Sequence, residues 1–443
     1  MRNNNLLSIP FLAALLLTGC NPSSDNIEVV FWHTMGQANQ STLNEMISSF
    51  NEKYPKIKIS HSSQGNYDDL ASKIKKAIPV GNTPTMAFCY PDNVADYIAS
   101  GAIQELTPYL TDSEIGFVAE EGSHMEGSVV KYGVDDYIPG YWGEGSEYQA
   151  DGLYSVPFSK STEALFYNAT YFEQNELEVP TTWTEMLALC RQIKQISPTK
   201  IPLGYDSDSN LYITLSQQLG IPYTSKDPEA HYQFNNADAK EMVGWLKGFY
   251  DEGLFVTKGA SPNNSYTSTQ FTNGEVIMTI GSTGGTSYNT SGNFEVEVAV
   301  PPSIDAGQPA VISQGPSITV FKRATNEEKR AAWLFYKHIT NTENSARYSI
   351  LTGYEPVRVS SYESDVYQLH LNAEGENINL FTKTANTTIT MRNSYFYSPV
   401  FIGSATARDE VGGIIANVLL GQKTIEAAFN DALTACVFGG QVG

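Results

Sequence analysis

The sequence predicts an α/β protein built from two domains or from two lobes of one unit. The chain has 443 residues, which is more than one hydrophobic core normally organises. Along its first part, short apolar runs typical of strands alternate with longer segments whose apolar residues recur at helical spacing. Stretches rich in glycine and tyrosine separate later elements, and their backbone freedom suits a crossing between lobes.

The N-terminal elements follow the strand-then-helix order of an α/β sheet. Strands are predicted at 27–31, 57–59 and 85–88. Between the first two strands, a helix is predicted from the spacing of Leu43, Met46, Ile47, Phe50 and Tyr54, with Pro55 closing it. The next helix carries Tyr67, Leu70, Ala71, Ile74 and Ile78 on one face.

Later helices are marked by their start signals. Thr182 with Glu185 and Thr325 with Glu328 both match the Thr-x-x-Glu capping box, in which side chains satisfy the free backbone N–H groups of a helix start. A further helix is predicted at about 239–251, ending at Gly253. We place the first crossing between lobes near the tyrosine-rich stretch 132–154, and the second between a strand at 275–280 and a strand at 298–302.

Composition excludes several classes of partner. The chain has 27 basic and 48 acidic side chains and a net charge of −21, so nucleic acid and an anionic membrane surface are not expected as main partners. Its 26 tyrosines and 20 phenylalanines, with 41% hydrophobic residues, also differ from a disordered acidic chain. A folded protein with aromatic-rich surfaces fits this composition.

The N-terminus predicts an export signal and a lipid anchor. An apolar run from Leu6 to Leu17 follows Arg2, and it is shorter than the roughly 20 residues of a spanning helix. It ends in Leu17-Thr18-Gly19-Cys20, which resembles the lipobox of bacterial lipoproteins. We expect a signal peptide at 1–19, lipidation of Cys20 and a polar tether at 20–26, which anchors an extracytoplasmic protein to the bacterial cell membrane. The alternative is a buried helix with an incidental cysteine.

Catalytic and metal-binding signatures are not found in the sequence. The other cysteines, Cys89, Cys190 and Cys436, have no metal-ligand spacing and are expected to be buried thiols. The chain has no phosphate-binding loop, no nucleophile elbow and no zinc-protease helix. Glu144 and Glu147 could form a glycosidase acid/base pair, yet an acidic chain brings carboxylates close by chance. We expect no catalytic residue, no metal and no cofactor.

Several motifs in order along the chain resemble one family. They resemble the extracellular solute-binding proteins of ABC importers, the family 1 sugar-binding group, and within it the glycerol-3-phosphate-binding proteins. The resemblance spans nearly the whole chain after the tether. The motifs that carry it include Phe31-Trp32-His33-Thr34-Met35, Phe50-Asn51-Glu52-Lys53-Tyr54-Pro55, Gly65-Asn66-Tyr67, Gly81-Asn82-Thr83-Pro84, Phe271-Thr272-Asn273-Gly274-Glu275 and Thr352-Gly353-Tyr354-Glu355-Pro356-Val357.

The resemblance implies a bilobed periplasmic-binding-protein-like fold of type II, with the ligand held in a cleft between two α/β lobes. It implies an N-terminal lobe of 27–135 plus about 299–342 and a C-terminal lobe of 136–298 plus about 343–443. It also implies binding without chemistry, a monomer, and delivery of a small-molecule ligand to ABC permease subunits in the membrane.

Matching the family's ligand positions assigns a set of binding residues by resemblance. A tyrosine ring at a helix start, such as Tyr67, can cover the apolar face of a sugar. The turn that holds Tyr354 is restricted by Pro356, two residues later. Ordinary core packing remains the alternative for both rings. The assigned residues are Tyr67, Tyr90, Asp92, Ser161, Ser282, Thr283, Gly315 and Tyr354.

One departure from the family decides the predicted ligand. Phe401 stands where the glycerol-3-phosphate-binding relatives are expected to carry an arginine that grips the phosphate, and nothing in the sequence places Arg392 or Arg408 in the cleft. An aromatic ring cannot neutralise a phosphate but can stack on a sugar, so we include Phe401 among the ligand residues. We therefore predict a mono- or oligosaccharide ligand. Glycerol-3-phosphate or a glycerophosphodiester is the alternative, followed by a secreted carbohydrate-active enzyme and by a chemoreceptor or adhesin partner.

Overall fold

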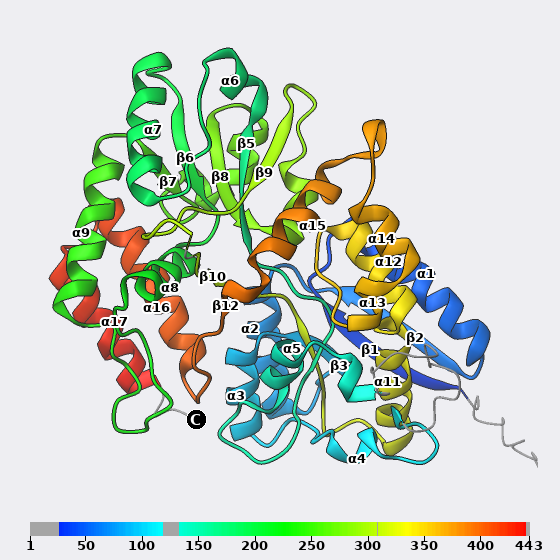
Figure 1. Ribbon diagram of the computed structural model, residues 1–443. Helices are drawn as coiled ribbons and strands as arrows, with labels where there is room; N and C mark the ends of the chain where they lie inside the picture. Colours follow the sequence, from blue (N-terminus) through cyan, green and yellow to red (C-terminus); the bar gives the residue numbers. More distant parts are fainter. Residues whose placement is uncertain (1–25, 118–132, 308, 440–443) are drawn as a thin grey trace, which may run out of the picture.

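Two β-sheets flanked by helices form the two lobes of the computed structural model, which describes residues 26–117, 133–307 and 309–439 (Figure 1). The first sheet has the strand order β2-β1-β3-β11-β4 and the second has the order β7-β6-β8-β5-β9. In each sheet a set of parallel strands is extended by antiparallel ones. The predicted α/β class with two lobes is confirmed.

The first lobe contains the N-terminal strands and a later return of the chain. Its strands are β1 (Ile27–His33), β2 (Ile57–Ser63), β3 (Met86–Cys89), β4 (Val156–Pro157) and β11 (Ser317–Val320). Its helices are α1 (Gln37–Lys53), α2 (Tyr67–Val80), α3 (Pro91–Ala99), α4 (Thr107–Leu110), α5 (Pro139–Gly143), α11 (Asn326–Ile339), α12 (Thr342–Thr352), α13 (Val359–Glu363) and α14 (Asp365–Leu371). The three predicted N-terminal strands are present, and each extends further at its carboxyl end.

The second lobe is built from the middle and the end of the chain. Its strands are β5 (Glu163–Asn168), β6 (Ile201–Tyr205), β7 (Phe255–Thr257), β8 (Val276–Ser282) and β9 (Val296–Ala299). Its helices are α6 (Ala169–Gln174), α7 (Trp183–Ile196), α8 (Asp208–Leu219), α9 (Ala237–Asp251), α10 (Thr267–Thr272), α16 (Ser404–Leu419) and α17 (Ile425–Gly439). A short pair of strands, β10 (Val311–Ile312) and β12 (Tyr395–Phe396), and helix α15 (Leu380–Met391) lie between the lobes (Figure 1).

The helix start signals read from the sequence are confirmed. Thr182 accepts a hydrogen bond from the backbone of Glu185, whose side chain accepts one from the Thr182 backbone, and Thr325 and Glu328 do the same. Such a cap contributes about 1 kcal/mol to helix stability. These local signals therefore set the starts of α7 and α11 without help from the rest of the fold.

The crossings between lobes lie later in the chain than predicted. Strand β4 still pairs with β11 in the first sheet, so the first crossing is 158–162, beyond the tyrosine-rich stretch. That stretch packs into the first core instead, where Tyr137 and Tyr141 are each 1% exposed. Val298 pairs with Phe166 in the second sheet, so the chain is still in the second lobe at Val298, and the second crossing comes after this residue.

The lobe boundary predicted near residue 343 also differs from the structure. Helices α12 to α14 stay with the first lobe, because Tyr348 and Val357 pack into its core. The chain leaves this lobe only after α14, and it reaches the second through α15, which contacts β9.

Three cysteines are buried free thiols, as expected: Cys89, Cys190 and Cys436. The predicted signal peptide and Cys20 lie outside the described residues. Within the described ranges, no helix combines the length and the apolar character that crossing a bilayer requires.

The two crossing segments pair with each other through their backbones. Ser161 donates its N–H to the carbonyl of Gln314 at 2.9 Å, and Gln314 donates back at 2.7 Å. Gly315 follows with φ of +107°, and a Cβ built on it would lie 2.4 Å from the carbonyl oxygen of Ser159. Gly315 is therefore required by the close approach of two backbones.

We expect Gly315→Ala to destabilise the protein by about 2–3 kcal/mol, because strain from the positive φ adds to a backbone clash. Gly101→Ala is the matched control, since Gly101 also has a positive φ of +70° but open space around its Cβ position. It should cost about 1 kcal/mol. Urea unfolding monitored by circular dichroism measures both values, and equal losses would show that the backbone contact is unimportant.

Candidate ligand-binding site

The carboxyl ends of parallel strands from both sheets face one cavity between the lobes. In the first lobe these are the ends of β1, β2 and β3, and in the second the ends of β6, β7 and β8. Ligands of α/β proteins bind at this edge of a sheet, because loops after the strands present side chains and free backbone groups there. The residues that line the cavity directly after these strands include Thr34, Gly65, Tyr90, Asp206, Lys258 and Gly284.

This main cavity has a volume of about 1430 Å³ and a wall rich in tyrosine. Its size exceeds the roughly 300–1,000 Å³ of sites that enclose one small molecule. Acidic side chains outnumber basic ones along the wall. The aromatic lining consists of Phe88 and of six tyrosines: Tyr67, Tyr90, Tyr266, Tyr288, Tyr348 and Tyr354.

Tyr67 and Tyr90 form one aromatic wall from two neighbouring strand-to-helix turns. Asn66 caps α2 by accepting a hydrogen bond from the Asp69 backbone at 2.9 Å, which fixes Tyr67 as the first residue of the helix. Tyr90 is the N-cap residue of α3. Their ring centroids lie 4.2 Å apart at 39°, and burial raises the pKa of both hydroxyls well above the usual range, so both stay neutral donors and acceptors.

Tyr354 faces the second lobe across the cavity. A Cβ on Gly284 would lie 2.4 Å from Cζ of Tyr354, so the ring packs directly on the Gly284 backbone. Gly284 belongs to the turn after β8, where Ser282 accepts a hydrogen bond from the Gly284 N–H at 3.2 Å. A side chain at position 284 would displace the Tyr354 ring from this position.

A hydrogen-bonded network from the second lobe forms the polar floor of the cavity. The Arg408 guanidinium and the Gln314 amide both donate to Oδ1 of Asn210, the latter at 2.9 Å. Asn210 donates in turn to Glu163 at 2.9 Å, and Tyr205 donates to the other oxygen of Glu163. Arg408 makes no direct ion pair with a carboxylate of the described residues, so part of its donor set is open to a ligand.

Burial controls the charge of two acidic groups near Arg408. It raises the pKa of Glu163 to about 7, although Tyr205, Asn210 and Arg408 each oppose the shift. Asp92, on the first turn of α3, also has its pKa raised by burial, while Arg408 and a hydrogen bond from Ser404 lower it. The charge of the floor near neutral pH is therefore smaller than a count of side chains suggests.

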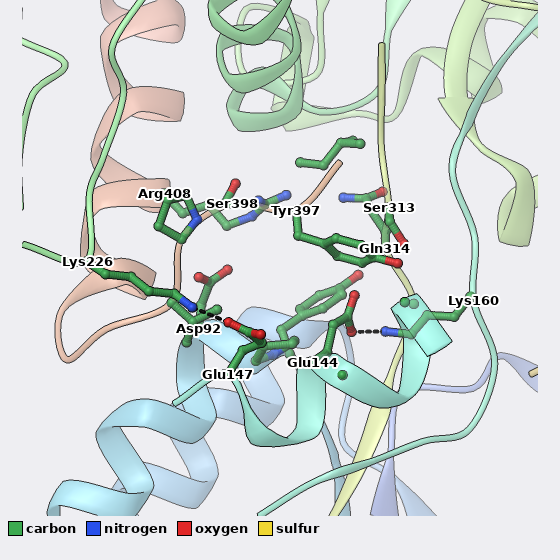
Figure 2. Close-up of a pocket in the computed structure, with 18 of the residues that line it drawn as sticks. Asp92, Glu144, Glu147, Lys160, Lys226, Ser313, Gln314, Tyr397, Ser398 and Arg408 are labelled. Atoms are coloured by element: carbon green, nitrogen blue, oxygen red, sulfur yellow. Dashed lines mark hydrogen bonds and ion pairs between the residues drawn. The ribbon is translucent and has the colours of Figure 1, made fainter. Parts of the chain in front are cut away.

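A second, smaller hollow of about 490 Å³ opens beside the main cavity, and we call it the side compartment (Figure 2). Its wall includes the buried ion pair of Lys160 with Glu144 and the ion pair of Lys226 with Glu147. Lys160 is only 1% exposed. Both pairs are drawn as dashed lines in Figure 2.

The structure brings six of the predicted ligand residues to the main cavity: Tyr67, Tyr90, Asp92, Ser161, Ser282 and Tyr354. Gly315 lines the side compartment instead. Thr283 is fully buried and lines neither space, and its hydroxyl accepts a hydrogen bond from the Thr162 N–H at 3.2 Å. The assignment of Thr283 to the ligand site is therefore corrected to a structural role.

The assignment of Phe401 to the cleft is also wrong. Phe401 is 0% exposed, lines neither cavity and stacks on the His231 ring at a centroid distance of 4.2 Å and an angle of 2°. Arg408, on the second turn of α16, lines both spaces. The cleft thus contains a guanidinium where an aromatic ring was expected.

Sequence reasoning missed Glu163, Asn210, Gln314 and Arg408. Asn210 ends the polar run Asp206-Ser207-Asp208-Ser209-Asn210, which directly follows β6, and this position at the carboxyl end of a strand is a usable signal. Glu163 is the first residue of β5, Gln314 lies on a crossing segment and Arg408 lies on α16. These residues are far apart in the sequence, so no local pattern shows that they meet. Across the described ranges, no group of three or more His, Cys, Asp or Glu is arranged to hold a metal ion.

Comparison with known proteins identifies the family. Residues 45–375 match the family described as bacterial extracellular solute-binding protein. This chain belongs to that family. The sn-glycerol-3-phosphate-binding periplasmic protein UgpB of Escherichia coli K12 is 26% identical over 351 residues, which cover 76% of this chain and 75% of the relative. UgpB of Shigella flexneri gives the same values.

Solved structures confirm the bilobed fold of type II. UgpB from Mycobacterium tuberculosis, in complex with glycerophosphocholine, superposes with a TM-score of 0.77 at 17% identity, covering 94% of this chain and 99% of that one. Lmo0181 from Listeria monocytogenes, in complex with cycloalternan, superposes with a TM-score of 0.76 at 17% identity, covering 93% of this chain and 98% of that one. The GacH receptor of Streptomyces glaucescens superposes with a TM-score of 0.74 at 18% identity, covering 93% of this chain and 97% of that one.

We expect the Glu163 carboxyl to make stability fall as pH rises. Its pKa is about 7 in the folded protein against 4.5 for an ordinary glutamate. Its contribution is therefore complete below about pH 4.5 and is lost as pH rises through about 7, a change of up to about 3 kcal/mol. Glu163→Gln keeps the shape and removes the titration.

The free energy of unfolding of both proteins, measured by urea titration between pH 4.5 and 8, tests this expectation. The variant should gain stability relative to the wild type across that range. A difference that stays constant with pH would mean that Glu163 is ionised throughout.

Proposed function

We propose that this solute-binding protein is the lipid-anchored, substrate-binding component of an ABC importer and that it captures a carbohydrate between its lobes. Its ligand is a mono- or oligosaccharide, which it delivers to the membrane permease without chemical change. The protein acts as a monomer, held at the outer face of the bacterial membrane through Cys20.

The observation that carries the carbohydrate proposal is the lining of the main cavity. Six tyrosines offer flat apolar faces and neutral hydroxyls, which suit the C–H faces and hydroxyls of a sugar. Two of the four basic groups are already engaged, since Lys75 pairs with Asp96 at 3.2 Å and Lys258 lies 4.3 Å from the Tyr266 ring centroid. The relatives bound to acarbose and cycloalternan support the same class.

A second candidate ligand is glycerol-3-phosphate or a glycerophosphodiester. Arg408 favours it, because a guanidinium without a direct ion pair can form two parallel hydrogen bonds to a phosphate. The UgpB relatives point to the same class. Against it, Asp92 and Glu163 line the cavity beside Arg408, and their negative charge, where ionised, repels a phosphate dianion.

Calorimetric titration tests the ligand class directly. The panel contains mono- to hexasaccharides of α- and β-linked glucose, glycerol-3-phosphate and glycerophosphocholine. We expect a sugar to bind with the lowest dissociation constant. Binding of the phosphate compounds alone would contradict the carbohydrate proposal and favour the second candidate.

Tyr67→Ala should weaken sugar binding roughly three- to tenfold, because stacking on an aromatic ring contributes about 0.5–1.5 kcal/mol beyond its buried area. Phe401→Ala is the control, since Phe401 is fully buried outside both cavities. That variant should lose about 3–5 kcal/mol of stability and keep its affinity at a temperature where it is folded. Weaker binding by Phe401→Ala alone would contradict the placement of the site.

Arg408→Met separates the two ligand classes. Methionine keeps much of the side-chain length and removes the charge, so binding of a neutral sugar should weaken no more than about tenfold through the lost hydrogen bonds. A phosphate ligand would lose two charge-assisted hydrogen bonds and more than 100-fold in affinity. Titration of both ligand types into this variant measures the difference.

A further inference from the structure

The side compartment adjoins the main cavity. Four residues line both spaces: Tyr90, Asp92, Gln314 and Arg408. They come from the first lobe, from a crossing segment and from the second lobe, so the two spaces adjoin where the lobes meet. A ligand that reaches these residues from the main cavity has the side compartment on their other side.

Among the described residues, most charged groups in the wall of the side compartment are paired, and the two that are not, Asp92 and Arg408, lie at its boundary with the main cavity. The buried ammonium group of Lys160 is paired with Glu144, and a buried pair of this kind has no need of a charged ligand. Lys226 and Glu147 pair across the lobes, and both side chains are substantially exposed, at 46% and 60%. Exposed pairs are weak, so this outer wall can move to admit a ligand.

The remaining polar groups suit hydroxyls. Oγ of Ser398 is buried and has no hydrogen-bond partner among the described residues. A buried hydroxyl without a partner is costly. Because Ser398 lines the side compartment, rotation about its Cα–Cβ bond would turn the hydroxyl toward a ligand there. Pro139, Pro399 and Tyr397 supply apolar surface around it. An unsatisfied hydroxyl and a flat apolar surface together match the hydroxyl groups and the C–H faces of a sugar ring.

We propose that the side compartment receives a terminal sugar residue of an oligosaccharide whose remaining residues lie in the main cavity. The proposal rests on the carbohydrate function proposed above and narrows it from sugars in general to oligosaccharides. The compartment's 490 Å³ lies within the range of sites that enclose a small molecule. Tyr90 and Arg408 then contact the ligand where it passes from one space to the other.

Gly143 provides a direct way to fill the side compartment. It lines the compartment, and a Cβ built on it meets nothing within 4 Å. Gly143→Trp therefore introduces a large side chain without a clash at its first atom. Gly248→Trp is the matched control, because Gly248 also lies on a helix with open space at its Cβ position and lines neither cavity.

The probes are the series from glucose to maltohexaose and from glucose to cellohexaose, titrated into the wild type and both variants. We expect Gly143→Trp to weaken the best-bound oligosaccharide at least tenfold, with Gly248→Trp unchanged. The proposal would be overturned if Gly143→Trp bound every sugar of the panel with the same dissociation constant as the wild type. Absence of sugar binding by the wild type itself would instead overturn the carbohydrate function, so the two failures are distinguishable.

Ser398→Ala gives a second readout that does not depend on whether Gly143→Trp folds. It removes only the unpartnered hydroxyl, so the thermal midpoint should not fall. The best-bound oligosaccharide should bind roughly two- to tenfold more weakly through loss of one neutral hydrogen bond, and glucose, if it binds in the main cavity, should be unaffected. Unchanged oligosaccharide affinity in this variant would count against the proposal.

Discussion

The backbone pairing of the two crossing segments is the constraint on which the rest of the site depends. Ser161 and Gln314 exchange two hydrogen bonds, and Lys160 makes a second pair with Glu355 at 3.3 and 2.6 Å. This pairing holds three segments of the chain side by side. Each segment supplies a residue that lines the main cavity: Ser161, Gln314 and Tyr354. The connection between the lobes and the centre of the ligand site are therefore the same piece of structure.

This arrangement explains how binding can couple to the relative position of the lobes. Tyr67 and Tyr90 from the first lobe and Arg408 from the second line the main cavity, so the proposed ligand would contact both lobes. Such a ligand favours the conformation in which both sets of contacts are made. A shift from 1:99 to 99:1 requires about 10⁴-fold preference for that state, or about 5.5 kcal/mol. The direct contacts between lobes, such as Lys226 with Glu147, are too weak to prevent this shift.

Local features of the fold could be predicted from the sequence, and long-range features could not. Helix caps at Thr182 and Thr325 and the strand-then-helix units around Tyr67 and Tyr90 depend on neighbouring residues only. The glycines of the tyrosine-rich stretch suggest a flexible connection and hence a crossing there, whereas Tyr141 within that stretch is buried in the first core. No local pattern shows that burial, because its partners come from distant parts of the chain.

The same limit applies to the ligand site. Tyr67, Tyr90, Asp92 and Tyr354 follow recognisable strand ends or turns, and the structure brings them together. The sequence predicts Phe401 in the cleft and gives no reason to place Arg408 there, whereas the structure buries Phe401 and brings Arg408 to both cavities. The packing of α16 against α17, α8, α9 and α3 decides which of the two residues faces the cavity. The contact with α3 includes a hydrogen bond from the Gly403 N–H to Asp96 at 3.1 Å.

A crystal structure with the tightest-binding ligand of the titration panel tests the central claim most directly. We expect electron density for the ligand between the lobes, with a ring stacked on Tyr67 or Tyr90 and polar atoms within hydrogen-bond distance of Arg408. Ligand density that contacts one lobe only, or that lies outside the main cavity and the side compartment, would contradict it.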